Sequence, residues 1–159
     1  MSEKFITQNI RRRDVLAVAG TGVVAASTIG LFVGDAMADP AAVAKAIKAK
    51  IGDKKTMAGN VTLELPQIAE NGNTVPIAVE VKSPMTGSDY VKAVHIYSEG
   101  NPAPDVATFR FTPDSGRARV SLRMRMIKSQ NVVAVAEMSN GKVHMVKNAV
   151  KVTIGGCGG

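Results

Sequence analysis

Large aromatic side chains are scarce in the 159-residue chain, which contains no Trp, two Tyr and four Phe. The core must therefore be built mainly from Val, Ile, Leu, Ala and Met, which a domain of about 120 residues can do without disulfide bonds. Recognisable catalytic patterns are also missing: paired carboxylates, a nucleophile elbow, a Ser-His-Asp order, a P-loop and a dinucleotide fingerprint. We therefore expect neither a self-contained enzyme nor a bound cofactor.

Metal-ligating side chains are few and scattered. His95 and His144 each stand alone in a strand-like run, without Asp, Glu or Cys nearby at ligand spacing. Several methionines also lie in strand patterns, where packing in a core or interface is their ordinary role; they are Met124, Met126, Met138 and Met145. The sequence therefore predicts structural or surface roles for the histidines and no metal site.

Cysteine is present once. Cys157 cannot form an internal disulfide, has no second cysteine for a Cys-x-x-Cys motif, and stands third from the end, which excludes a prenylation box. An unpaired cysteine in an oxidising compartment is buried, joined to another molecule or reactive. The residues around Cys157 decide among these roles.

The N-terminal segment has the features of an export signal. An arginine pair within Arg11–Arg13 precedes an uncharged run from Val15 to Val33, and Ala36-Met37-Ala38 follows with the small residues that signal peptidase requires. We predict a twin-arginine signal peptide over residues 1–38 and a periplasmic mature protein. The alternative is a retained membrane anchor, since 19 uncharged residues can cross a bilayer. The Gly, Ala, Ser and Thr content of the run favours cleavage after Ala38, which leaves no stable membrane association.

Positive charge predominates. The formal net charge is +7, and removal of residues 1–38, with their four basic and three acidic side chains, lowers it only to +6. A basic protein can bind nucleic acid, anionic membranes, acidic proteins or small anions. Because export takes the chain away from nucleic acid, acidic partners and small anions remain as the expected ligands.

The mature region is predicted to begin with one short helix and to continue as strands. Asp39 and Pro40 are typical of a helix N-terminus, and Gly52 is typical of its end. From Val61 onward apolar and polar residues alternate, most clearly over 75–81, and turn clusters separate the runs. About seven strands are expected, near residues 61–65, 75–81, 90–98, 106–111, 117–128, 131–138 and 143–154.

Strands at roughly ten-residue spacing without intervening helices are typical of an all-β, immunoglobulin-like antiparallel β-sandwich, although a small barrel has the same pattern. The predicted organisation is a signal peptide over 1–38, a β-sandwich domain over 39–154 and a C-terminal arm over 155–159. The short helix belongs to the sandwich domain and precedes its first strand.

One predicted strand carries a row of arginines. Over residues 117–126, alternation places Ala, Val, Leu and Met on one face and four arginines with Ser121 on the other. Guanidinium groups pair well with carboxylates and sulfur oxyanions, so this face could bind an acidic partner or an anionic substrate. A solvated outer face of the sandwich explains the pattern equally well. The four residues are Arg117, Arg119, Arg123 and Arg125.

The chain ends in a glycine-rich pentapeptide. Two glycines precede Cys157 and two follow it, at positions Gly155, Gly156, Gly158 and Gly159. Glycine lacks a Cβ and accepts both signs of φ, so the thiol is expected on a mobile and sterically open arm. The three residues beyond Ile154 reach roughly 10 Å when extended, which suits entry into a narrow cleft of another protein.

A thiolate at this position can hold sulfur covalently. Disulfide, persulfide and S-thiosulfonate bonds survive diffusion between sites and still break by attack at sulfur. We therefore expect a covalent carrier of an oxidised sulfur species, with Cys157 as its attachment point. The alternatives are an unselected tail, or a secreted structural sandwich that uses Cys157 for an intermolecular disulfide.

These features resemble the SoxY family, the carrier subunit of the periplasmic Sox system of thiosulfate oxidation. Members of that family have a twin-arginine signal and a β-rich domain and end in Gly-Gly-Cys-Gly-Gly, which residues 155–159 match at every position. The resemblance extends over most of the chain, and the pentapeptide is its specific motif.

The resemblance implies partners and a reaction cycle. SoxY forms a heterodimer with SoxZ, the haem protein SoxAX joins thiosulfate to the carrier cysteine, and SoxB hydrolyses off sulfate. The sulfane dehydrogenase SoxCD, where present, oxidises the remaining sulfur. In this chain the attachment point corresponds to Cys157 and the flanking glycines to a swinging arm. A ubiquitin-like sulfur carrier, the rival class that ends in Gly-Gly, needs ATP, and the export signal argues against it.

Overall fold

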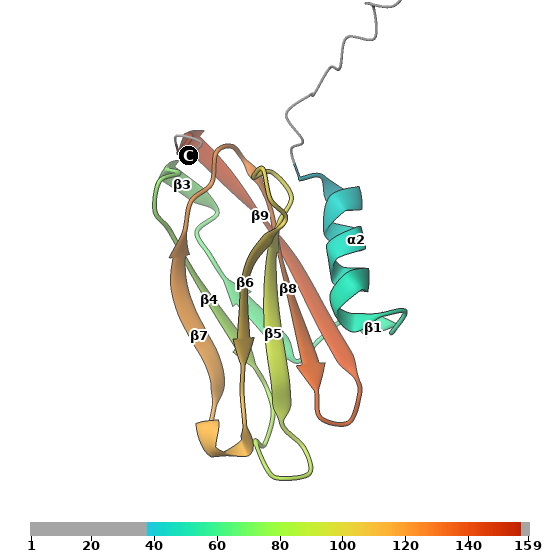
Figure 1. Cartoon of the computed structure of the whole chain (residues 1–159). Coiled ribbons are helices and arrows are strands. Elements are labelled where there is room, and N and C mark those ends of the chain that lie inside the picture. Colours follow the sequence, from blue (N-terminus) through green and yellow to red (C-terminus); the bar gives the residue numbers. More distant parts are fainter. Residues whose placement is uncertain (1–37, 157–159) are drawn as a thin grey trace, which may run out of the picture. The chain divides into compact units, whose positions relative to one another are not determined.

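The computed structural model describes residues 38–156 (Figure 1). This range contains the predicted β-sandwich domain and the first two glycines of the predicted arm. The predicted signal peptide up to Met37 and the last three residues, Cys157, Gly158 and Gly159, lie outside the described residues. Between residues 38 and 156, no helix has the length and apolar character needed to span a membrane.

The domain begins with helix α2 (Pro40–Ile51), as the sequence predicted. Asp39 is the N-cap, since its Oδ1 accepts a hydrogen bond from the backbone N–H of Ala42 at 2.6 Å. Pro40 occupies the first turn, where the missing N–H has no intrahelical partner to lose. Gly52 ends the helix with a φ of 70°, a conformation that glycine adopts without strain.

Within the described range, nine strands form two sheets and confirm the predicted all-β, immunoglobulin-like sandwich (Figure 1). The smaller sheet has three antiparallel strands, in the order β2 (Val61–Glu64), β4 (Val75–Val81) and β7 (Ala118–Met124). The larger sheet has the order β1 (Thr56–Met57), β9 (Val143–Ile154), β8 (Gln130–Met138), β5 (Val91–Ser98) and β6 (Asp105–Arg110). A short strand, β3 (Ile68–Asn71), pairs with β9, and a 3-10 turn, η1 (Pro113–Ser115), precedes β7.

The main core lies between the two sheets. The alternating apolar residues of β4 are buried on its inner face, as the period-two pattern predicted. β5 and β8 supply the opposite wall with small and branched side chains, chiefly Val94, Ile96, Val132, Ala134 and Ala136. This aliphatic packing fills the core without Trp.

The central strands β5 and β8 are buried on both faces. Their outer-face residues Tyr97, Val133 and Val135 pack in a second apolar cluster with Val43 and Ile51 of α2. Figure 1 shows α2 lying along this sheet. Burial on both sides explains why β5 and β8 are nearly continuous apolar runs rather than alternating ones.

Strand β9 pairs with three strands along its length. Residues 143–150 pair antiparallel with β8 on one side, whereas residues 143–144 pair parallel with β1 and residues 151–154 pair parallel with β3. The sequence did not predict β3 or β1, because strands of four and two residues are too short to show a period. The last residues of β9 therefore lie beside β3, past the end of β8.

Strand β7 ends at Met124, four residues before its predicted end at residue 128.

Replacement of Tyr97 by Phe is expected to raise the free energy of unfolding by about 1 kcal/mol. Tyr97 is 0% exposed, and its hydroxyl has no hydrogen-bond partner among residues 38–156. Burial, with the nearby Asp105 and Glu137, raises the pKa of Tyr97 to about 12, so the hydroxyl is buried as a neutral, unpaired group. Phe keeps the ring and removes that group. Urea denaturation of the two proteins measures the difference.

The control is Tyr97→Ala, which removes the ring as well and is expected to lose about 3–5 kcal/mol. A loss of stability in the Phe variant that approaches the loss in the Ala variant would contradict the prediction, because it would require a strong hydrogen bond at the buried hydroxyl.

Candidate functional site

The C-terminal end of β9 is tied to two distant loops by backbone hydrogen bonds. The N–H of Gly72 donates to the carbonyl of Ile154 at 2.7 Å, and the carbonyl of Gly72 accepts from the N–H of Met126 at 2.7 Å. The carbonyl of Met126 in turn accepts from the N–H of Gly156 at 2.9 Å. We call Gly155 and Gly156 the arm root, because they precede Cys157 directly.

The arm root lies very close to neighbouring backbone. A Cβ on Gly155 would stand 2.2 Å from the carbonyl oxygen of Ile127, and one on Gly156 would stand 2.7 Å from Cγ of Arg125. A Cβ on Gly72 would stand 2.2 Å from the carbonyl oxygen of Met126. These contacts are shorter than non-bonded atoms tolerate, so only glycine fits at the three positions. Gly156 is buried against the sandwich, whereas Gly155 is exposed on one side and approaches the backbone of Ile127 on the other.

Cys157, the predicted attachment point, lies outside the described residues, as do Gly158 and Gly159. Gly156, which precedes Cys157 in the sequence, is the last described residue. Gly156 lies against Arg125 and Asn73. The chain therefore attaches the thiol-bearing residue at this end of the sandwich.

Arg119 is paired with two carboxylates on the outer face of the smaller sheet. Its guanidinium donates to Glu80 at 2.7 Å and to Glu64 at 3.1 Å. Hydrogen bonds with Glu64 and Glu80 raise the pKa of Arg119. The two carboxylates balance its charge, so Arg119 joins strands β2, β4 and β7 and is a poor candidate for binding an external anion.

The other three candidate arginines divide between the two ends of β7. Arg123 and Arg125 lie at its C-terminal end, where both line a groove of about 510 Å³ together with Asn101 and Ile127. Arg117 is exposed and precedes the first residue of β7. The structure therefore brings Arg123 and Arg125, but not Arg117 or Arg119, to the end of the sandwich that carries the arm root.

Asn101 holds the segment that connects β7 to β8. Its Nδ2 donates to the carbonyl of Arg125 at 2.7 Å, and its Oδ1 accepts from the N–H of Ile127 at 3.3 Å and from Nε2 of Gln130 at 2.9 Å. In the sequence, Asn101 and Gly72 are typical only of turns. Their hydrogen bonds reach residues at least 24 positions away in the chain, so no short sequence pattern could have identified them.

Comparisons with known proteins identify the family. The family model described as "Sulfur oxidation protein SoxY" matches residues 47–157. The solved structure of the sulfur carrier protein SoxY from Chlorobium limicola f thiosulfatophilum is 36% identical, covers 72% of this chain and 98% of its own, and has a TM-score of 0.62. The chain belongs to the SoxY family. A search of curated proteins finds no match.

More distant structures share the fold. Neelaredoxin, a superoxide reductase from Ignicoccus hospitalis, is 17% identical, covers 76% of this chain and 98% of its own, and has a TM-score of 0.53. A putative superoxide reductase from Thermotoga maritima is 16% identical, covers 62% of this chain and 93% of its own, and has a TM-score of 0.52. At such low identity the likeness concerns the β-sandwich only. SoxY membership, by contrast, gives the chain a carrier role in sulfur oxidation and relates it to Sox-system partners in general.

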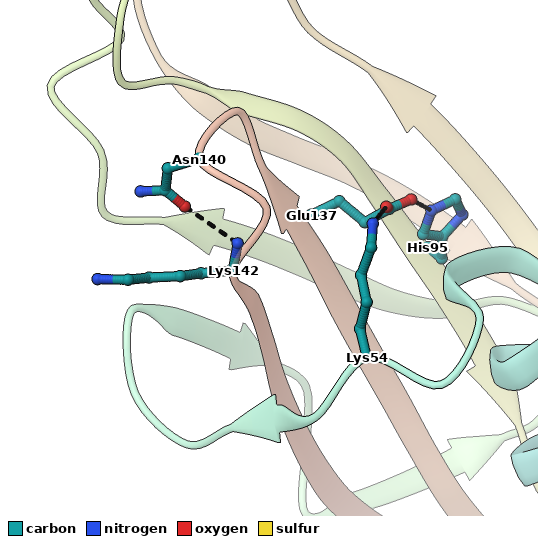
Figure 2. Close-up of polar contacts among 5 residues, drawn as sticks. All are labelled: Lys54, His95, Glu137, Asn140 and Lys142. Carbon is teal, nitrogen blue, oxygen red and sulfur yellow. Dashed lines mark hydrogen bonds and ion pairs between the residues drawn. The ribbon is translucent and has the colours of Figure 1, made fainter.

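A partly buried polar network lies near the other end of β9 (Figure 2). His95 is 4% exposed, and its Nε2 contacts Oε1 of Glu137 at 3.0 Å while its Nδ1 contacts the hydroxyl of Thr108 at 3.0 Å. Nζ of Lys54 donates to the second oxygen of Glu137 at 3.3 Å. Figure 2 shows Glu137 between Lys54 and His95. The network joins β5, β6 and β8 to the segment that follows α2.

This network is remote from the arm root. Glu137 pairs with Val143, the first residue of β9, whereas the arm root follows Ile154, roughly 35 Å along the strand at 3.3 Å per residue. Figure 2 also shows the nearby hairpin turn, where the N–H of Lys142 donates to Oδ1 of Asn140 at 3.0 Å. In the part of the chain that the structure describes, no three His, Cys, Asp or Glu side chains could jointly hold a metal ion. The contacts of this network tie four parts of the SoxY-family domain together.

The free energy that Glu137 contributes to folding is expected to depend on pH. Burial raises the pKa of Glu137, but hydrogen bonds from His95 and Lys54 outweigh burial and hold the pKa below its usual 4.5. A carboxyl group with a lowered folded-state pKa stabilises the protein above its unfolded pKa and loses this effect as pH falls through the folded value. Glu137→Gln should therefore be less stable than the wild type near neutral pH, and the difference should shrink below about pH 4.5.

Urea denaturation over a pH series measures this difference, with the exposed Glu70→Gln as the matched control. The gap between the two variants is expected to narrow as the solution becomes acidic. A gap that stays constant down to about pH 3 would show that Glu137 acts by packing and not by charge.

Proposed function

We propose that this SoxY-family protein is the periplasmic carrier that holds thiosulfate-derived sulfur covalently on Cys157 and presents it to partner Sox enzymes. The position of Cys157 carries the proposal, because this residue is the last of the family match and directly follows the packed arm root. A terminal thiol attached near Arg123 and Arg125 suits an adduct that is anionic and must be transferred.

Loading joins the outer sulfur of thiosulfate to the Cys157 thiol. The new S–S bond forms with release of the thiol proton and two electrons, and the haem protein SoxAX is the proposed electron acceptor. Water, activated by SoxB, then attacks the terminal sulfonate sulfur, so that sulfate leaves and a persulfide stays on Cys157. SoxCD, where present, oxidises the persulfide sulfur. The carrier supplies the attachment point, and its partners supply the catalytic groups.

SoxZ is the proposed stable partner, in a heterodimer, with SoxAX, SoxB and SoxCD as transient ones. The predicted twin-arginine signal over residues 1–38 fits a chain that folds and pairs before export. The mature charge of +6 favours acidic partners and small sulfur anions over cationic ligands. Cleavage after Ala38 would release the carrier into the periplasm.

Arg123 is the proposed source of positive charge near the adduct. It lines a groove that Arg125 and Ile127, two neighbours of the arm root, also line together with the acidic Asp105. A guanidinium group binds sulfonate oxygens through paired N–H donors. Arg119 is excluded from this role, because Glu64 and Glu80 already bind it.

Cys157→Ser is expected to abolish thiosulfate-dependent turnover in a reconstituted Sox system while the fold and SoxZ binding remain intact. Serine keeps the size of the side chain and removes the nucleophilic sulfur. Intact-mass spectra of the wild type should show an adduct after loading that a reductant removes, and the variant should show none. Undiminished turnover by Cys157→Ser would refute the carrier function.

A matched control variant carries its only thiol at another position in the domain. Ser88 is exposed in the connection before β5, so Ser88→Cys in the Cys157→Ser background offers a thiol away from the arm root. This double variant should not restore turnover. If the wild type shows only a stable disulfide-linked dimer and no sulfur adduct, the alternative of a structural secreted sandwich is supported instead.

A further inference from the structure

We propose that Gly72, Asn73, Met126 and Ile127 form a clamp that holds the arm root and thereby fixes the point from which Cys157 can move. We call these four residues the root clamp. Gly155 and Gly156 are then positioning residues and belong to the folded domain. The purpose of the clamp rests on the proposed function, whereas its geometry can be tested independently.

Backbone hydrogen bonds make the clamp continuous. The end of β9 is bonded to Gly72 through the carbonyl of Ile154, Gly72 is bonded to Met126, and Met126 is bonded to Gly156. Gly156 is buried, so its N–H is removed from water and depends on this partner. Because these contacts join backbone atoms, they require a close approach of the chains and not particular side chains.

Side chains at the arm root would break this approach. A Cβ placed on Gly156 would have three close neighbours. It would stand 2.7 Å from Cγ of Arg125, 2.9 Å from the carbonyl oxygen of Gly72 and 3.1 Å from Oδ1 of Asn73. The space next to Gly155 is bounded by the carbonyl oxygen of Ile127 at 2.2 Å. Backbone atoms cannot relieve such a clash by a change of rotamer, as the end of a flexible side chain can. A methyl group at either position should therefore open the clamp.

The walls of the clamp are themselves held in place. Met126 is fully buried, and Asn101 binds the backbone on both sides of it, at Arg125 and at Ile127. On the other side, the hydroxyl of Ser129 accepts the N–H of Val152 in β9 at 2.9 Å. The segment after β7 therefore cannot move away from the arm root without losing several hydrogen bonds.

The clamp sets the reach of the thiol. With the clamp closed, only one peptide unit, about 3.8 Å between Cα atoms, separates the thiol-bearing residue from the fixed Gly156. Release of Gly155 and Gly156 would add roughly 7 Å. A partner enzyme must therefore accept this end of the sandwich, with Arg125 beside the arm, unless binding opens the clamp.

A paramagnetic label on Cys157 tests the clamp, because the chain has no other cysteine. A methanethiosulfonate nitroxide is attached in the wild type and in the Gly155→Ala, Gly156→Ala and Gly158→Ala variants, and amide line broadening is measured by NMR. In the wild type the strongest broadening is expected at Gly72, Asn73 and Met126. Alanine at position 155 or 156 should reduce it at least several-fold, whereas alanine at 158, beyond the clamp, should leave it unchanged.

A variant with inserted glycines keeps the test decisive even if the alanine variants misfold. Two extra glycines between Gly156 and Cys157 leave the clamp intact and move the label outward by roughly 7 Å, so broadening should fall while the amide of Gly156 stays protected from hydrogen exchange. Equal broadening in all variants, or rapid exchange at Gly156 in the wild type, would overturn the clamp. Localised broadening in a protein that never forms a sulfur adduct would leave the clamp standing and refute the carrier function.

Discussion

The divided pairing of β9 determines where the chain presents its C-terminus. Along its first part β9 belongs to the larger sheet, held by β8, and beyond residue 150 it pairs with β3 instead. The turn that follows β3 contains Gly72, so the same short strand that extends β9 also delivers the residue that binds its last carbonyl. Without β3, the last residues of β9 would lack a neighbouring strand, and the arm root would have no fixed partner. The two-layer core behind them supplies the rigidity on which this arrangement depends.

Much of the fold could be predicted from the sequence because its signals are local. Alternation over β4, the cap formed by Asp39 and the breakers between runs each depend on a few neighbouring residues. The short strands β1 and β3 could not be predicted, because their pairing with β9 is set by residues far away in the chain. The predicted continuation of β7 to residue 128 failed for a similar reason: Asn101, on another loop, binds the backbone after Met124 and draws it away from the sheet.

The candidate site, like the fold, has features that the sequence reveals and features that it does not. The pentapeptide around Cys157 is a contiguous motif, so the sequence alone suggests its chemistry, and the attachment role of Cys157 stays a prediction. Alternation also placed the arginines on one face of a strand, but it could not show that Glu64 and Glu80 bind Arg119, since these residues are 55 and 39 positions away. The close approach of Gly155 and Gly156 to neighbouring backbone could not be seen from the sequence. Glycine serves both flexible chains and close packing, and the sequence alone does not distinguish the two.

Attachment through backbone atoms has an evolutionary consequence. The hydrogen bonds that reach the arm root itself come from backbone atoms, and the Asn101 and Ser129 side chains act on it only through the loops that they hold. The exposed side chains nearby can therefore change in charge and shape through substitution while Gly156 keeps its place. A carrier built in this way can vary this part of its surface one residue at a time.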